Sequence, residues 1–257
     1  MDSAQRLKVL FLSQPFLYPL DSGGKIRTGK LLEKLRAVFD IALVSNFDPA
    51  TDAAHLHHVE KLCHEFHAVP SKGSKKYSAG FYFKVLTRMF SRYPITVIGD
   101  YSRAIEKKLL NLVRHRDYDI LICDFLQPTL NFKRLRGRPM LLFQHNIESV
   151  IPRRHYEVAQ NWFMKLFWWL QWRKMLRYEI ETCQKFSAVV TVSESDKKLL
   201  EDRYSATNVF AIPTGVDTEY FSPSEDRVNP NSLVFTGSMD WLPNEDAILF
   251  FARDILW

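Results

Sequence analysis

The sequence has few of the residues that mark several well-defined classes of protein. It contains three cysteines in 257 residues and no C-x-x-C pair, which excludes a zinc ribbon or a thiol redox motif. Nine glycines and twelve prolines exclude a collagen-like or low-complexity chain. No stretch offers the roughly 18 charge-free apolar residues that a membrane span needs. The only apolar run near the start, Val9–Leu12, is too short for a secretory signal, so we expect a cytoplasmic protein.

The composition is that of a globular protein with one locally basic segment. Hydrophobic residues make up 46% of the chain, and 19 Phe, 6 Trp and 10 Tyr supply ample surface to bury, which excludes intrinsic disorder. The net charge is +6, and residues 71–98 carry six basic residues and no acidic one. This one segment therefore accounts for the whole net charge. A protein that binds nucleic acid tends to be basic more generally, so we expect no nucleic-acid partner.

Apolar strands alternate with helical patterns along most of the chain. The predicted strands are 8–13, 40–45, 65–69, 120–124, 140–144, 188–192 and 209–212. The predicted helices are 25–38, 52–64 with Asp52 near its cap, 79–92, 101–115, 149–183 and 194–203. Continuous apolar strands separated by helices predict an α/β fold, a Rossmann-like parallel sheet with helices on both faces.

A polar, proline-rich stretch divides the sequence. Residues 1–221 form the predicted first domain and 222–231 (SPSEDRVNPN) a linker. A strand over Leu233–Thr236 and a helix from Asn244 then begin a second Rossmann-like domain over 232–257. Two short elements cannot bury a core of their own, so we expect this second domain to be truncated; the alternative is that these elements pack on the first domain.

Four polar or glycine-containing turns follow predicted strands, at the edge where parallel sheets bind ligands. In the first, Asp21–Lys25, Gly23 and Gly24 let backbone N–H groups approach an anion at a helix N-terminus. The other three are Gln144–Glu148, Val192–Asp196 and Ile212–Asp217. Taken singly, each also fits an ordinary turn or a helix cap, and Ser193 or Ser195 would serve as such a cap.

Together and in this order, the four turns resemble the N-terminal domain of GT-B glycosyltransferases, and the large retaining family 4 in particular. The matching features are the Gly-Gly loop, H-N-x-E after a middle strand, V-S-E-x-D, and P-x-G-V-D before the linker. Residues 235–241 look like the first strand and glycine loop of the nucleotide-binding domain. The stretch 10–28 and QHNIES are similar to sugar transferases associated with exopolysaccharide and exosortase-linked gene clusters.

The resemblance implies two Rossmann-like domains facing each other across a cleft, with the acceptor on the N-terminal one and the nucleotide-sugar donor on the other. It implies a retaining transferase for a glycan or polyprenyl-linked acceptor in polysaccharide synthesis, with no metal and no other cofactor. His145 would contact the transferred sugar near the reacting carbon, and Gly23 and Gly24 would approach the donor diphosphate or the acceptor. The other residues expected to bind substrate are Lys25, Arg27, Asn146, Glu148, Ser193, Gly215 and Gly237.

The sequence departs from the family on the donor side. The E-x7-E donor motif does not occur, Ser238 stands where a basic residue is usual, and Pro243-Asn244 stand where a lysine is usual. Lys25 or Arg27 would then supply part of the charge that neutralises the diphosphate. We expect this chain alone to be inactive. The alternatives are a non-catalytic fragment or binding module, and another GT-B-like enzyme such as a nucleotide-sugar epimerase.

Two segments have the composition of lipid-contacting helices. On a helix over 79–92, Lys84, Arg88 and Arg92 form a basic stripe beside an aromatic arc. This predicts peripheral contact with an anionic membrane, on its inner face; the alternative is a helix packed on the domain. The segment Trp162–Trp172 carries aromatic residues on nearly all faces. It is expected either to be buried against the sheet or the second domain, or to contact a lipid or polyprenyl acceptor.

Overall fold

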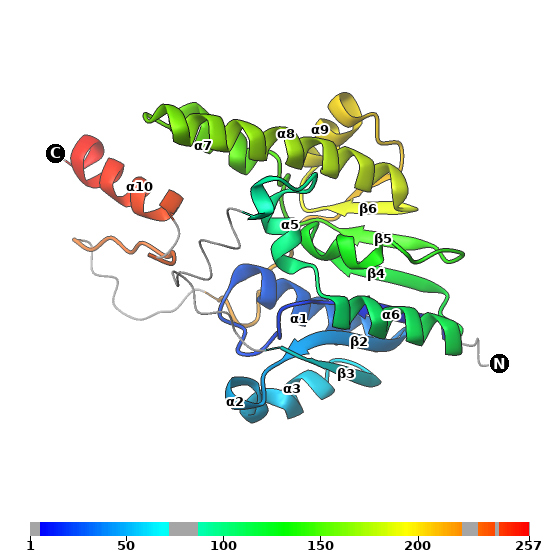
Figure 1. Cartoon of the computed structure of the whole chain (residues 1–257). Helices are drawn as coiled ribbons and strands as arrows, with labels where there is room; N and C mark the ends of the chain where they lie inside the picture. Colours follow the sequence, from blue (N-terminus) through cyan, green and yellow to red (C-terminus); the bar gives the residue numbers. More distant parts are fainter. Residues whose placement is uncertain (1–5, 72–86, 223–230, 240–241, 257) are drawn as a thin grey trace. The chain divides into compact units, whose positions relative to one another are not determined.

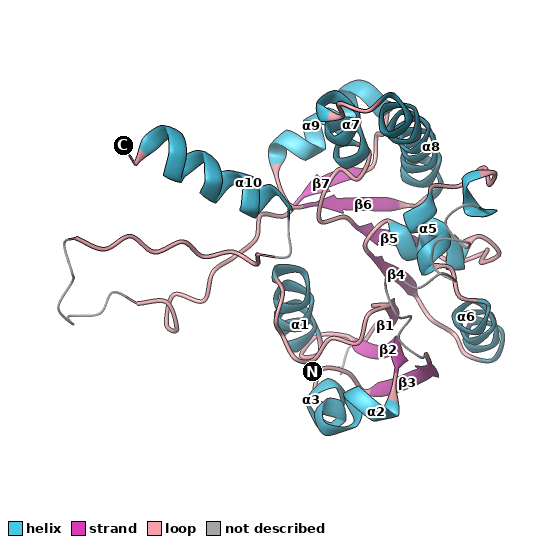
Figure 2. Cartoon of the chain, turned by 60° about the vertical axis from the view of Figure 1, so that its left-hand side comes forward, coloured by secondary structure: helices cyan, strands magenta, loops and turns pink. Residues whose placement is uncertain are grey.

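The sheet has seven parallel strands in the order β3-β2-β1-β4-β5-β6-β7 (Figures 1 and 2). The computed structural model describes residues 6–71, 87–222, 231–239 and 242–256. The strands are β1 (Lys8–Leu12), β2 (Asp40–Phe47), β3 (Glu65–Pro70), β4 (Ile120–Asp124), β5 (Met140–Phe143), β6 (Ala188–Thr191) and β7 (Val209–Ala211). The α/β class with a parallel, Rossmann-like sheet is confirmed.

Helices cover both faces of this sheet. They are α1 (Gly23–Leu35), α2 (Pro49–Asp52), α3 (Leu56–Glu60), α5 (Ile95–Asp100), α6 (Arg103–His115), α7 (Val150–Val158), α8 (Trp162–Lys185), α9 (Glu194–Tyr204) and α10 (Leu242–Phe250). Two 3-10 turns, η1 (Ala53–His55) and η2 (Gln127–Phe132), and a π-helical turn, η3 (Phe251–Ile255), complete the set. None of the helices among the described residues is long and apolar enough to cross a membrane.

The central strand β1 is buried on both faces, which is why its sequence is apolar without alternation. Val9 and Phe11 pack in one core with α1 and α3, whereas Leu10 and Leu12 belong to the other core, with α6, η2, α8 and α9. The chain runs outward from β1 to β2 and β3, and then crosses back to β4 on the other side of β1. The order therefore reverses between β1 and β4, the position where open α/β sheets bind ligands.

The chain separates into two compact units, residues 1–214 and 215–257. The sheet lies in the first unit. In the second, the structure describes α10 and η3, and the strand expected over Leu233–Thr236 is not formed. A strand needs a neighbour to satisfy its backbone N–H and C=O groups, and the described residues of this unit contain no other strand.

The prediction of one long helix over 149–183 is wrong, because the structure has two helices there. α7 ends at Val158, and Asn161 starts α8 by accepting a hydrogen bond from the backbone N–H of Phe163 (2.8 Å). The two helices then run antiparallel, with the rings of His155 and Trp168 stacked at 4.3 Å. The apolar pattern continues through the turn, so only Asn161 marks the break in the sequence.

Other local expectations also changed. The helix expected over 52–64 starts at Pro49, because Asp48 is the cap and accepts a hydrogen bond from the N–H of Ala50 (3.0 Å). It is divided into α2, η1 and α3. α5 and η2 were not expected. Of the helix expected over 79–92, residues 87–89 are helical, and residues 79–86, with Lys84, lie outside the described residues.

Candidate functional site

The carboxyl ends of β1, β4 and β5 bring polar side chains to one buried carboxylate. Asp124 is the last residue of β4 and is fully buried. Its Oδ2 accepts hydrogen bonds from Ser13 Oγ (3.2 Å), just after β1, and from Thr28 Oγ1 (2.9 Å) on α1. Its Oδ1 lies 2.8 Å from Nε2 of His145, just after β5. We call these four residues with Phe125 the Asp124–His145 cluster.

The imidazole of His145 is held in one orientation. Phe125 stacks on one face with ring centroids 3.9 Å apart, and the edge of Phe143 meets it at 4.9 Å. The side chain is 8% exposed. Because Asp124 is a carboxylate surrounded by donors, Nε2 carries the proton and donates to it. Nδ1 is then the nitrogen available to a ligand.

Phe125 links this histidine to the glycines after β1. Its backbone lies in the left-handed region with φ of 67°, which is uncommon for a residue other than glycine. Its N–H bonds to the carbonyl of Phe143 (2.9 Å), and its ring fills the space beside Gly24. A Cβ on Gly24 would lie 2.7 Å from the Phe125 ring, whereas nothing lies within 4 Å of the Cβ position of Gly23. Gly24 is therefore required for close packing, and Gly23 is open.

Arg27 places a positive charge beside the cluster. Its guanidinium stacks over Phe143 at 4.3 Å, and Nη2 donates to the carbonyl of Ile212 (2.8 Å). Nη1 is buried and has no hydrogen-bond partner among the described residues. Burial lowers the pKa of Arg27, and the nearby Asp124 carboxylate acts in the opposite direction. The guanidinium thus has one unsatisfied donor beside a polar cluster, which suits an anionic oxygen.

The family described as Glycosyltransferase Family 4 matches residues 21–220, from the turn before α1 to beyond β7. The chain belongs to this family. No curated protein was found to match it.

Two solved structures are similar in fold to this family 4 chain. Sucrose-phosphate synthase from Thermosynechococcus elongatus has a TM-score of 0.57 and 14% identity, over 86% of this chain and 51% of that one. TcCGT1 in complex with UDP has a TM-score of 0.50 and 12% identity, over 88% and 54%. The chain spans about half the length of these structures. The sheet is that of the N-terminal domain of GT-B glycosyltransferases.

A second buried carboxylate fixes the loop that carries His145 in this family 4 chain. Glu179 of α8 is fully buried, and its Oε1 accepts from Gln144 Nε2 (2.5 Å) and from the N–H of Glu148 (2.7 Å). Its Oε2 accepts from the N–H of Ser149 and the hydroxyl of Tyr204, both at 3.1 Å. Both ends of the loop 144–149 are thus tied to one side chain, and His145 lies between them.

Glu148 is held inside this loop with a perturbed acidity. Its side chain is buried, and burial raises its pKa to about 7, with the charges of Glu179 and Asp100 acting in the same direction. A hydrogen bond from Gln127 opposes the shift. Glu148 therefore takes up a proton near neutral pH. It lies in the loop that follows β5 at the carboxyl edge of the sheet.

The other expected site residues are spread over several positions. Lys25, beside Gly24, forms an ion pair with Asp21 (2.9 Å). Asn146 is exposed in the His145 loop. Ser193 caps α9 by accepting from the N–H of Asp196 (3.1 Å), which is the ordinary capping role. Gly215 and Gly237 belong to the second unit.

No sequence pattern singled out Ser13, Thr28, Asp124, Phe125 or Glu179. For Asp124 a signal existed, since one acidic residue ends the otherwise apolar strand 120–124 at the ligand-binding edge. Glu179 lies within a predicted long helix, and nothing in the neighbouring sequence distinguishes it from a helix residue that faces solvent. Among the described residues, no three histidine, cysteine or acidic side chains gather as a metal site.

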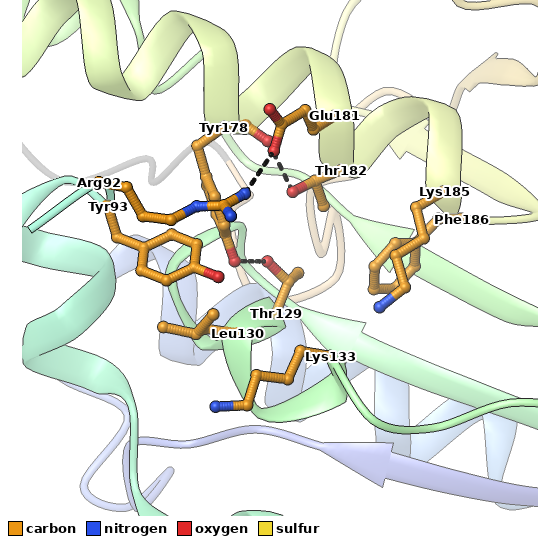
Figure 3. A pocket seen from close by; sticks show the side chains of 10 residues that line it. All are labelled: Arg92, Tyr93, Thr129, Leu130, Lys133, Tyr178, Glu181, Thr182, Lys185 and Phe186. Atoms are coloured by element: carbon orange, nitrogen blue, oxygen red, sulfur yellow. Dashed lines mark hydrogen bonds and ion pairs between the residues drawn. The ribbon is translucent and has the colours of Figure 1, made fainter.

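A small cavity elsewhere in the first unit does not compete as a substrate site (Figure 3). Its volume of about 120 Å³ is below the roughly 300–1,000 Å³ of ligand pockets. Four of its polar side chains pair with one another: Arg92 with Glu181 (3.6 Å), and the hydroxyl of Tyr178 with that of Thr129 (2.7 Å). None of its lining residues belongs to the Asp124–His145 cluster.

Gly24→Ala is expected to lower the free energy of unfolding by roughly 1–3 kcal/mol, because the new methyl group overlaps the Phe125 ring. Gly23→Ala is the matched control and should leave stability unchanged or slightly raised, since alanine favours helix more than glycine. Urea unfolding of both variants measures the difference. Equal effects of the two substitutions would show that Phe125 does not occupy this space.

Glu179→Ala is expected to cost roughly 2–4 kcal/mol, because two backbone N–H groups and two side-chain donors lose their buried acceptor. Glu181→Ala, two residues on, removes a half-exposed carboxylate whose partners are Arg92 and Arg177. It should cost less than about 1 kcal/mol. Thermal unfolding of the two variants provides the comparison, and a loss at Glu181 as large as at Glu179 would contradict the assignment.

Glu148→Gln is expected to flatten the dependence of stability on pH. The folded state keeps the Glu148 proton up to about pH 7, whereas the unfolded chain releases it near 4.5. Raising pH through this window therefore destabilises the wild type, by up to roughly 3 kcal/mol. The variant lacks this loss. Unfolding at pH 5 and pH 8 measures it, with the exposed Glu157→Gln as control; an unchanged slope in Glu148→Gln would exclude the raised pKa.

Proposed function

We propose that this chain is the acceptor-side part of a glycosyltransferase that moves a sugar from a nucleotide-sugar to a glycan or polyprenyl-linked acceptor. The observation that carries the proposal is the family 4 match over 21–220, together with a buried Asp124–His145 pair at the carboxyl edge of the sheet. The proposed reaction retains the anomeric configuration and belongs to polysaccharide synthesis, with no metal or other cofactor. A neighbour with the same fold, TcCGT1, was solved in complex with UDP, which supports a nucleotide donor.

His145 is proposed to contact the transferred sugar through Nδ1. With Nε2–H donated to Asp124, the neutral ring accepts a hydrogen bond from a sugar hydroxyl, and the protonated ring donates one. Asp124 fixes the tautomer, and Phe125 and Phe143 fix the ring plane. A group held in this way loses little entropy on binding, which is how positioned side chains stabilise a transition state.

Arg27 is proposed to meet anionic oxygens of the donor diphosphate. Departure of the nucleotide leaves negative charge on its phosphate, and a guanidinium stabilises that charge. Arg27, whose Nη1 is buried without a hydrogen-bond partner among the described residues, lies on the same helix as the first turn of α1, which contains no acidic residue. Gly23 lies in that turn with open space above it. Lys25 is a second candidate, and would have to exchange its ion pair with Asp21 for the ligand.

Membrane contact by residues 79–92 at the inner face of a membrane belongs to the same proposal. Arg88 and Arg92 are within the described residues, and Phe90 is 89% exposed between them. A peripheral surface of this kind would suit a lipid-linked acceptor.

His145→Ala is expected to lower kcat by roughly 100-fold or more in the protein that joins this chain to a complete nucleotide-sugar domain, because the sugar loses a positioned hydrogen-bonding group. His115→Ala removes an exposed histidine at the end of α6 and should leave kcat unchanged. Sugar transfer and thermal unfolding are measured on both.

The chain of 257 residues on its own is the second control. We expect it to transfer no sugar, because the described part of its second unit contains no sheet to form the donor wall. Wild-type kcat in His145→Ala, or transfer by the 257-residue chain at the rate of the two-domain protein, would overturn the proposal.

A further inference from the structure

The α7–α8 hairpin extends beyond the part of the first unit that packs on the sheet (Figure 1). None of the first nine residues of α8, 162–170, is buried, and the first buried side chain on the helix is Gln171. Nine residues correspond to roughly 13 Å of helix. The C-terminal half of α8 lies against the core through Met175, Tyr178 and Cys183. The hairpin thus has a packed base and a free end.

Large apolar side chains cover this free end. Trp162 is 65% exposed, Phe163 63%, Leu166 48% and Trp169 41%; we call these four residues the hairpin tip. Trp162, Leu166 and Trp169 recur at i, i+4 and i+7, so they share one face of the helix. Two tryptophans and a phenylalanine gathered in water are unusual for a soluble domain, and such a patch marks an interaction surface.

The tip residues face outward because other aromatic residues already hold the hairpin together. His155 stacks on Trp168, and Tyr156 lies over Trp172 with centroids 5.9 Å apart. These pairs fill the space between α7 and α8. The tip side chains lie outside these pairs and are exposed, and Trp162 and Phe163 stack on each other at 3.5 Å.

The charge around the tip selects the kind of partner. Residues 150–173 contain four basic residues, Arg153, Arg154, Lys165 and Arg173, and one acidic residue, Glu157. Glu157 is already paired with Arg153 at 2.8 Å. A second copy of this hairpin would bring like charges together, which disfavours self-association. Tryptophan flanked by arginine and lysine is instead the composition of the boundary between acyl chains and anionic headgroups.

We propose that the hairpin tip docks on an anionic lipid bilayer, with the four apolar side chains at the headgroup boundary and the surrounding basic residues on the headgroups. The inference deepens the proposed function, since a polyprenyl-linked acceptor lies in a bilayer. It rests on that function only for the reason why the chain would bind a membrane; the binding itself is argued from the hairpin tip. Six residues, 144–149, separate β5 from α7. The nine residues of α7, roughly 14 Å of helix, lie between this loop and the tip, so docking would hold the His145 loop within about that distance of the docked tip.

The test is co-sedimentation of the 257-residue chain with vesicles of phosphatidylcholine alone and with 30% phosphatidylglycerol. The chain is expected to bind the anionic vesicles, and binding should fall as salt rises, because exposed charges are screened over about 8 Å at physiological ionic strength. Trp162→Ser combined with Trp169→Ser should weaken binding by about 100-fold or more, and any binding that remains would come from the basic residues within 79–92. Lys165→Gln with Arg154→Gln and Arg173→Gln should weaken it by about 100-fold, since each charge contributes roughly fivefold.

Matched controls lie elsewhere on the first unit. Val38→Ser replaces an apolar residue that is 57% exposed after α1, and Arg103→Gln with Lys107→Gln removes two exposed charges from α6. Both should bind as the wild type does. Thermal unfolding confirms that each variant is folded, and a second tip variant, Phe163→Ser, replaces any that is not.

Three results would overturn the proposal: no binding to anionic vesicles, equal binding by tip and control variants, or a dimer in sedimentation equilibrium that the tip variant abolishes. The assay contains no sugar donor or acceptor. A chain that binds lipid but supports no sugar transfer in the two-domain protein would therefore refute the proposed function and leave the docking surface standing.

Discussion

The first unit depends on one buried negative charge. Asp124 ends the strand next to the central strand, and burying its carboxylate without partners would be costly. Donors on three separate segments, Ser13 after β1, Thr28 on α1 and His145 after β5, meet at its two oxygens. The same charge that must be satisfied for the sheet to fold thus fixes the histidine that the proposed chemistry needs. Stability and site geometry depend on the same three contacts.

Glu179 extends this arrangement by one layer. The loop after β5 has no regular structure of its own, yet two of its backbone N–H groups and the side chain of Gln144 bond to a carboxylate on α8. The base of the α7–α8 hairpin therefore positions the loop, while its free end carries the exposed aromatic residues. One pair of helices thus connects a buried polar network to an outer apolar surface.

The sequence predicted the inner strands well because burial on both faces makes them continuously apolar. Each strand of the sheet lies within two residues of its predicted bounds, including the edge strands β3 and β7, in which only Val69 and Val209 are buried. Helix breaks were harder: the reversal at Asn161 interrupts no apolar pattern, and Asp48 rather than Asp52 caps the helix after β2. At the site, the glycine turn and His145 could be predicted because polar or glycine residues follow an apolar strand at both positions. Thr28 and Glu179 were not, because each looks like an ordinary helix residue until the fold places it against a carboxylate.

The contact between Gly24 and Phe125 also bears on how related sequences can vary. The two positions are about a hundred residues apart in the chain, yet a Cβ at one and a ring at the other claim the same volume. Neither can change size alone without disturbing the stack on His145. We therefore expect the two positions to vary together in related sequences, with a larger residue at 24 accompanied by a smaller one at 125.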